Sequence, residues 1–160
     1  AQLDRFMFNI RIGYPTEEEE FQIVRRTTSD TLTQVERVLT RAELERYQHL
    51  VRRIPVADHV IRFAMRFSRS TRRQEADAPD FVKSYVSWGA GPRASQSLIL
   101  AAKAKAVLSG KTYVGTAEVL DVVLPVLRHR VITNFNAEAE GIGPDEVIRQ
   151  LVGLIPVSGG

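Results

Sequence analysis

Residues 88–108, WGAGPRASQSLILAAKAKAVL, decide the fold. Gly91 can serve as an N-cap, and Pro92 stands at the first helical position, where no backbone N–H is needed. The residues that follow are almost all good helix formers, and Gly110 is placed to end the helix as a C-terminal cap. The stretch therefore predicts a long, alanine-rich helix with Arg93 in its first turn.

Helical patterns also dominate the sequence on both sides of this stretch. Thr16 can cap a helix that begins with acidic residues, and Thr40 with Glu43 has the pattern of a capping box. Pro125 is expected to kink or restart a later helix. The predicted helices cover residues 16–26, 40–53, 56–69, 93–108, 116–131 and a last one from Pro144 that buries Val147, Ile148, Leu151 and Leu154, while residues 70–80 form a loop.

Residues near the start of the chain have strand periodicity instead. Phe6, Phe8, Ile10 and Ile12 alternate with other residues before Tyr14-Pro15 ends the pattern. A lone strand is not stable, so we expect this chain to be a piece of a longer one, with the sheet partners upstream and residues 1–15 poorly packed without them.

A second short strand is predicted over Val131–Phe135, as part of a small strand pair within residues 131–142. The predicted fold class is therefore mainly α-helical, a helical bundle preceded by one β-strand.

Composition restricts the class of protein without defining its function. The 160 residues are 44% hydrophobic and 26% charged, which allows one sizeable core. No apolar run approaches the roughly 20 residues needed to cross a bilayer, and no signal segment opens the chain, so we expect a cytoplasmic location. The chain has no cysteine, and its net charge of +3 is too small to indicate nucleic acid on its own.

Two apparent motifs do not predict chemistry. Ser109-Gly110-Lys111-Thr112 imitates the end of a phosphate-binding loop, but Lys105 stands where the first glycine is required and a helix precedes the motif. The three histidines, His49, His59 and His129, are too far apart to form a local ligand pair. We therefore expect no metal site.

Two arginines occupy chemically unusual positions. Arg93 lies in a first helical turn, where the helix dipole disfavours a cation unless an anion binds nearby. Arg5 lies at the start of the predicted strand beside Asp4. From spacing alone, the simpler interpretation of Arg93 is a surface arginine that tolerates the helix start. The simpler interpretation of Arg5 is a surface ion pair with Asp4.

A resemblance to a known family changes this balance. The segment from Ala1–Phe6, AQLDRF, through Gly13-Tyr14-Pro15 resembles the stretch of MoxR-family AAA+ ATPases that leaves the nucleotide-binding core. Residues 88–95, WGAGPRAS, are similar to the sensor-2 motif of that family, and residues 127–130 and 134–141 are similar to its ending. The resemblance implies the end of an AAA+ core over residues 1–33 and an α-helical lid domain over residues 34–160.

The resemblance also implies a function. Arg5 would be the arginine finger that reaches the ATP of a neighbouring subunit, and Arg93 would be sensor 2, presented by Gly91 and Pro92. Gly91 departs from the family, which usually has serine there. Such proteins use ATP and Mg²⁺, form rings that are usually hexameric, and act as chaperone-like remodelers, often with partners that carry von Willebrand A domains.

The phosphate-binding loop of the family would lie upstream of residue 1. We therefore expect this chain alone to bind no ATP or Mg²⁺ and to be inactive, although the complete protein would be an ATPase.

Two alternatives from other classes stay open. The first is a helical module that binds nucleic acid through a basic stripe, against which the interleaved acidic residues and the small net charge weigh. The second is a protein-interaction bundle without nucleotide chemistry, because helical folds host many functions. The stripe would comprise Arg62, Arg66, Arg69, Arg72 and Arg73.

Overall fold

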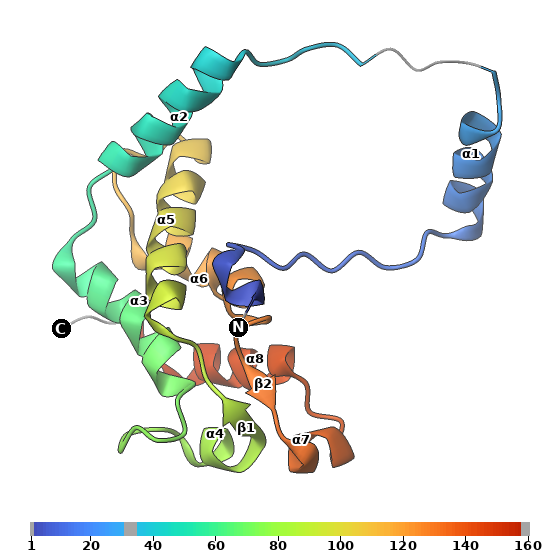
Figure 1. Ribbon diagram of the computed structural model, residues 1–160. Helices are drawn as coiled ribbons and strands as arrows, with labels where there is room; N and C mark the ends of the chain where they lie inside the picture. The colour runs from blue at the N-terminus through green and yellow to red at the C-terminus, as the bar shows by residue number, and fades with distance from the viewer. Residues whose placement is uncertain (1, 31–34, 158–160) are drawn as a thin grey trace.

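A computed structural model of the chain describes residues 2–30 and 35–157, and it confirms the mainly helical fold (Figure 1). The predicted boundary between residues 33 and 34 lies outside these ranges, as does part of the connector before it. The helices are α1 (Glu17–Thr27), α2 (Arg41–Arg53), α3 (Asp58–Ser70), α4 (Asp80–Tyr85), α5 (Pro92–Leu108), α6 (Thr116–Leu127), α7 (Phe135–Ala139) and α8 (Pro144–Leu154). A 3₁₀ turn, η1 (Leu3–Arg5), and the strands β1 (Val86–Trp88) and β2 (Ile132–Thr133) complete the order.

The predicted caps form as expected. Thr16 and Thr40 each make a capping box with the glutamate three residues later, at the starts of α1 and α2. Gly91 is the N-cap of α5 and Pro92 its first residue. Gly110 has a φ of +69° after the end of α5, a left-handed conformation that glycine adopts without a steric penalty. The sequence Ser109–Thr112 is therefore a helix stop, as predicted.

The core lies where α3, α5, α6 and α8 pack together. Phe63 and Phe67 of α3 are buried and meet edge to face, with ring centroids 5.1 Å apart. Alanines on α5 allow α6 to approach closely, because a small side chain keeps two helix axes near each other. The buried apolar residues of α5, α6 and α8 are Ala94, Leu98, Ala101, Ala102, Ala106, Val119, Val122, Val123, Val126, Leu127, Val147, Ile148 and Leu151. Leu154, predicted to be buried, is 58% exposed.

The small strand pair differs from the prediction in its partner. β2 pairs antiparallel with β1, which lies just before α5, and not with another segment of residues 131–142. Residues 135–139 form α7 instead, because the Asn134 side chain accepts a hydrogen bond from the Ala137 N–H and caps a helix there. The pair connects the end of α6 to the loop that leads into α5.

Helix α6 is shorter than predicted. Pro125 lies inside it without ending it, and the helix stops at Leu127. The N–H groups of Arg130 and Val131 both donate to the Leu127 carbonyl, so a turn over residues 128–130 follows. This turn brings three consecutive basic side chains, Arg128, His129 and Arg130, to the end of α6.

The prediction of a strand over residues 6–12 is wrong. This segment makes no strand pairing, and the side chains of Phe6, Phe8, Ile10 and Ile12 are all exposed. No other strand lies beside it within the described ranges, and its backbone binds the end of α6 instead, through the Asn9 N–H and the Pro125 carbonyl at 2.9 Å. Residues 4–9 are therefore better packed than predicted, although the apolar side chains stay uncovered.

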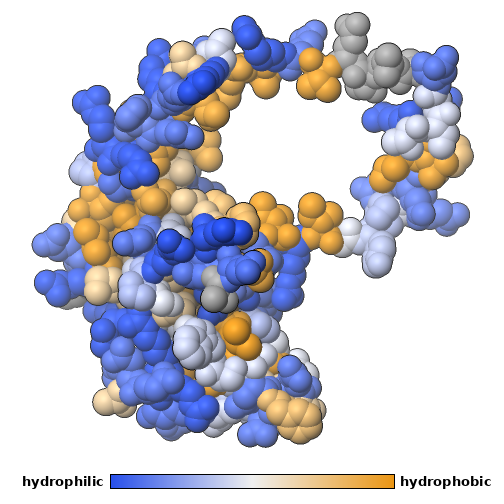
Figure 2. All heavy atoms as spheres, in the orientation of Figure 1, coloured by the Kyte–Doolittle hydropathy of each residue, from blue (hydrophilic) through white to orange (hydrophobic). Residues whose placement is uncertain are grey.

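Helix α1 stands apart from the body of the molecule (Figure 1). It has no buried residue, and Phe21, Ile23 and Val24 are exposed. Apolar side chains gather on the segment that leads to α1 and around the inner rim of the opening between α1, α2 and the body (Figure 2). Of the helices within the described ranges, none is long and apolar enough to span a bilayer.

Candidate functional site

The start of α5 is fixed by the loop that follows α3. A Cβ at Gly89 would meet the Thr71 carbonyl oxygen at 2.3 Å, so only glycine allows this close approach of two backbone segments. The Thr71 hydroxyl accepts a hydrogen bond from the Ala90 N–H at 2.8 Å, and Arg72 Nε donates to the Ala90 carbonyl at 2.9 Å. The position of Arg93 therefore depends on the loop that follows α3.

Arg93 is exposed in the first turn of α5. It makes no ion pair or hydrogen bond with any part of the chain that the structure describes. No acidic residue lies in this turn, and nothing lies within 4 Å of the position that a Cβ would take at Gly91. An exposed guanidinium and open space therefore meet at the start of α5, an arrangement that suits an anion.

Arg5 is also exposed, at the end of η1. Its guanidinium lies 5.4 Å from the centroid of the Phe6 ring, a cation–π distance. The ion pair with Asp4 that the local sequence suggested does not form, because Arg130 takes the Asp4 carboxylate, Nε to Oδ1 at 3.0 Å.

Arg130 anchors the segment that carries Arg5. Its side chain is 1% exposed. Besides Asp4 Oδ1, it donates to the backbone carbonyls of Asp4, Phe6 and Met7 at 2.9, 2.6 and 3.2 Å, and to that of Val126. It also donates to the Ser97 hydroxyl of α5 at 3.2 Å. A buried guanidinium is tolerated only when its donors are satisfied, as they are here.

The neighbouring basic residues hold the same segment. His129 Nε2–H donates to the Phe6 carbonyl at 2.9 Å, while the buried Nδ1 has no partner in the described chain. Burial lowers the pKa of His129, and the charge of Arg130 acts in the same direction. Arg128 donates to the Asn9 carbonyl at 3.3 Å and pairs with Asp145 at 3.1 Å. The three side chains replace the sheet partner that the segment lacks.

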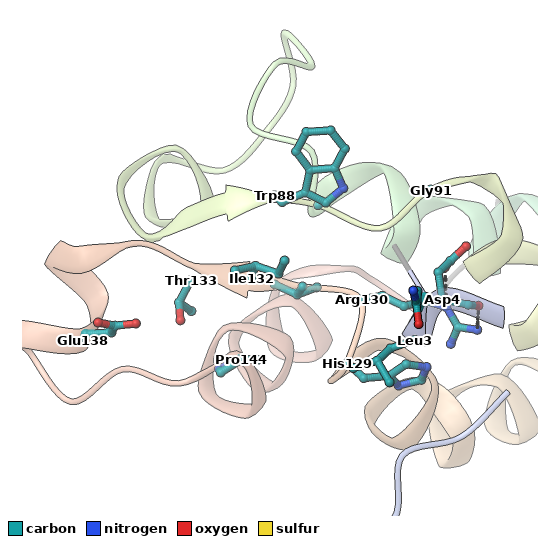
Figure 3. Close-up of a pocket in the computed structure, with 13 residues that line it drawn as sticks. Leu3, Asp4, Trp88, Gly91, His129, Arg130, Ile132, Thr133, Glu138 and Pro144 are labelled. Carbon is teal, nitrogen blue, oxygen red and sulfur yellow. Dashed lines mark hydrogen bonds and ion pairs between the residues drawn. The ribbon is translucent and has the colours of Figure 1, made fainter. Parts of the chain in front are cut away.

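A pocket of about 760 Å³ lies beside this anchor. Figure 3 shows Asp4 and Arg130 at one end of it and Glu138 at the other. Gly91 and Trp88 also line the pocket, so the N-cap of α5 and the η1 segment meet there. Neither Arg5 nor Arg93 lines it, and Pro92 faces a smaller recess behind Trp88. The structure thus brings the segments that carry the two arginines together without joining the two guanidinium groups.

Sequence reasoning missed Arg130 and Ser97. One signal was present: Val123, Val126 and Leu127 lie on the buried face of α6, and Arg130 continues that face at a spacing of three to four residues. A cation on an apolar stripe requires buried partners. Those partners come from residues 4–7, more than a hundred positions away, and no local pattern could identify them.

Two further points concern Lys111 and groups of side chains that could bind a metal ion. Lys111 pairs with the buried carboxylate of Glu118, and the hydrogen bond from Lys111 lowers the pKa of Glu118. Within residues 2–30 and 35–157, no group of three histidine, aspartate or glutamate side chains could hold a metal ion.

Residues 80–151 match the sequence family described as the AAA lid domain. Helices α4 to α7, the strand pair and most of α8 lie within this match.

Two curated relatives indicate which type of AAA+ protein this lid region resembles. The chain is 37% identical to Chaperone MoxR1 of Mycobacterium tuberculosis, over 152 residues that are 95% of this chain and 40% of that protein. It is 27% identical to the uncharacterized protein YeaC of Bacillus subtilis, over 98% of this chain and 47% of that protein. The predicted resemblance to the C-terminal lid region of MoxR-type AAA+ ATPases is confirmed.

A solved structure agrees with these relatives. The fold is similar to the crystal structure of a candidate ATPase from Cytophaga hutchinsonii, with a TM-score of 0.86 and 26% identity over 98% of this chain and 48% of that one. The chain thus spans less than half the length of each of these proteins.

Proposed function

We propose that this chain is the C-terminal part of an ATP-hydrolysing AAA+ subunit of the MoxR type, in which Arg93 acts as sensor 2 and Arg5 as the arginine finger. The observation that carries the proposal is the start of α5, where Arg93 is exposed, has no partner within residues 2–30 and 35–157, and lies in a helical turn without an acidic residue.

The location of Arg93 supports a phosphate contact within its own subunit. An exposed guanidinium at a helix N-terminus opposes the dipole by about 0.3–1 kcal/mol unless an anion is bound. A phosphate group there would receive a planar pair of donors from the guanidinium of Arg93. Gly91 and Pro92 begin that turn, and neither has a side-chain acceptor that would compete with a phosphate for the Arg93 guanidinium.

The location of Arg5 supports a contact outside its own subunit. Its side chain extends into solvent, while the residues on both sides are held by Arg130. A fixed backbone with a free guanidinium suits a group that stabilises charge on a phosphoryl group held elsewhere.

The residues present fit one side of an ATP site and not the whole of it. Arg93 can hold phosphate oxygens, but the described chain offers neither a phosphate-binding loop nor carboxylates grouped for Mg²⁺. When bound, ATP supplies the phosphoryl group and Mg²⁺ neutralises its charge. We infer that the chain alone hydrolyses no ATP, and that residues 1–33 complete an AAA+ core whose lid comprises residues 34–160.

The wider function is proposed on the same basis. We infer ring assembly with ATP between subunits, a cytoplasmic location, and chaperone-like remodelling of partner proteins that include von Willebrand A domain proteins. The exposed apolar side chains of residues 6–12 and α1 support assembly, because an apolar surface of this extent is normally covered in the complete particle.

The test uses the complete subunit with Arg93→Ala and Arg5→Ala. We expect Arg93→Ala to lower ATPase activity while the free energy of unfolding changes by less than about 0.5 kcal/mol, since Arg93 is exposed. We expect Arg5→Ala to retain ATP binding and to lose on the order of 10³-fold or more in hydrolysis.

Mixed rings give the decisive result for Arg5. Combining Arg5→Ala subunits with subunits that lack the phosphate-loop lysine is expected to restore part of the activity, because an intact loop then faces an intact finger. Unchanged ATPase activity in Arg93→Ala would remove the sensor-2 role. Mixed rings that assemble and stay inactive would remove the finger role.

The structure gives less support to the nucleic-acid alternative. Arg69 and Arg72 of the basic stripe both pair with Glu75, at 2.7 and 3.4 Å, and Arg72 also binds the backbone of Ala90. The aromatic side chains on the same helix, Phe63 and Phe67, are buried and so cannot stack on bases.

A further inference from the structure

We propose that Arg130 is a positioning residue that couples the helix carrying Arg93 to the segment carrying Arg5. This inference rests on the proposed function and extends it: through Arg130, the nucleotide state sensed in one subunit sets the position of the finger that this subunit offers to its neighbour.

The first step is that Arg130 cannot itself be a ligand-binding arginine. Its five N–H groups face six acceptors, all within the chain, and the side chain is 1% exposed. No donor is left for a phosphate. A guanidinium that is fully used in this way holds protein segments at fixed separations, because its planar fork is rigid.

The second step is the identity of the segments it holds. Asp4 and Phe6, the residues immediately before and after Arg5, both give their carbonyl oxygens to Nη2 of Arg130. Arg5 itself is left exposed between them. A displacement of Arg130 must therefore move the backbone on both sides of Arg5 together.

The third step leads from Arg130 to Arg93. The same Nη2 donates to the hydroxyl of Ser97 in α5, at 3.2 Å. Ser97 is buried and lies four residues after Arg93, which is about one helical turn, on the same side of the helix. If phosphate binding draws the start of α5 toward the nucleotide, Ser97 moves with it, since an α-helix transmits displacement as a rigid body.

One atom thus contacts both α5 and the residues that flank Arg5. The remaining donors fix the guanidinium to the Val126 carbonyl of α6 and to the Asp4 carboxylate. The arrangement predicts that the two proposed arginines work as a coupled pair even though their side chains do not meet.

The experiment uses the complete subunit with Arg130→Lys, which keeps the charge and loses the fork. We expect the Kd of a non-hydrolysable ATP analogue to stay within about twofold and KM to change little. We expect kcat to fall at least about tenfold, because a misplacement of about 1 Å in a catalytic group costs on the order of 10²-fold. Arg149→Lys is the matched control: Arg149 is an exposed arginine of α8 whose one ion pair among the described residues is with Glu146.

Ser97→Ala is a second variant that removes only the link to α5 and keeps the buried guanidinium. We expect kcat to fall by about twofold to tenfold, the factor that one hydrogen bond supplies. The double variant Ser97→Ala/Arg130→Lys should be no slower than Arg130→Lys alone, since both changes break the same connection.

Two readouts separate positioning from a merely structural role. Mixed rings of Arg130→Lys subunits and subunits without the phosphate-loop lysine should regain activity, as with Arg5→Ala, because Arg130 acts through a finger that serves the neighbouring site. Arg5→Ala/Arg130→Lys should be no slower than Arg5→Ala. A purely structural defect would lower the melting temperature, persist in mixed rings and add to the effect of Arg5→Ala.

The inference is overturned if Arg130→Lys keeps its kcat, or if its loss is not rescued in mixed rings while the loss in Arg5→Ala is. If instead Arg5→Ala itself keeps full hydrolysis, the proposed function fails and the inference fails with it. If Arg130→Lys does not fold, the comparison of Ser97→Ala with Ser97→Ala/Arg5→Ala decides: full additivity of the two losses would overturn the coupling.

Discussion

His129 combines a satisfied nitrogen with an unsatisfied one, and this makes it sensitive to pH. Nε2–H donates to the Phe6 carbonyl, so Nδ1 carries no proton in the neutral ring and lies buried without a partner in the described chain. Protonation would bury an unpaired N–H beside Arg130. The pKa of His129 is accordingly lowered from its ordinary value of 6.5, by burial first and by Arg130 in addition.

The pH dependence of stability follows from that direction. Because the folded pKa lies below the unfolded one, the unfolded chain binds more protons as the pH falls through about 6.5. We therefore expect the free energy of unfolding of this chain to increase from pH 5.5 to 7. His129→Gln, which can keep a donor to Phe6 without titrating, should flatten this increase. Denaturant unfolding at several pH values measures it, and an identical slope in His129→Gln would contradict the assignment.

At the scale of elements, two glycines near the start of α5 have opposite roles. Gly89 touches the backbone of Thr71, whereas Gly91 has open space around its Cβ position and an extended backbone with φ of −78° and ψ of −179°. We expect Gly89→Ala to destabilise the chain by about 1–3 kcal/mol through overpacking. We expect Gly91→Ser to stabilise it by a few tenths of a kcal/mol, because a serine side chain can cap α5.

Thermal and denaturant unfolding of the two variants provide the measurement, and each serves as the control for the other. A neutral Gly89→Ala would contradict the close approach between residues 89 and 71. A destabilising Gly91→Ser would show that the start of α5 requires glycine at position 91, and it would exclude the capping role of a serine there.

The elements that sequence could predict are those with local causes. Examples are the capping boxes at Thr16 and Thr40 and the start of α5 at Gly91-Pro92. Each depends on at most four consecutive residues, and each forms in the structure. The strand over residues 6–12 failed because alternation describes a strand only where a partner exists. The partner of β2 and the anchor of η1 depend on contacts between distant positions, which no single pattern in the sequence contains.

At the scale of the whole molecule, stability is distributed unevenly. The four helices of the core bury a continuous set of apolar side chains, and the η1 segment is attached to them by Arg128, His129 and Arg130. Helix α1 buries nothing. The segment with Arg5 and the start of α5 are therefore both attached to the core, whereas α1 buries no residue against it.

Hydrogen exchange on the isolated chain tests this division. We expect amides of α5 and α6 to exchange only through global unfolding, because they lie in the core. The Asn9 amide, bonded to the Pro125 carbonyl at 2.9 Å, should be protected although it belongs to no helix or strand. Amides of α1 should be protected by less than about tenfold, since an isolated helix of 11 residues is marginal in water even with good caps.

Arg130→Lys supplies the comparison, because it weakens the attachment and replaces none of the apolar side chains of the core. Protection of Asn9 should fall in that variant while α6 stays protected up to the limit set by the global free energy of unfolding. Protection of α1 equal to that of α5 in a monomeric sample would contradict the division, since it would require α1 to be packed against the body. Unchanged protection of Asn9 in Arg130→Lys would show that Arg130 is not needed to anchor the segment, which Arg128, His129 and the Pro125 carbonyl would then hold.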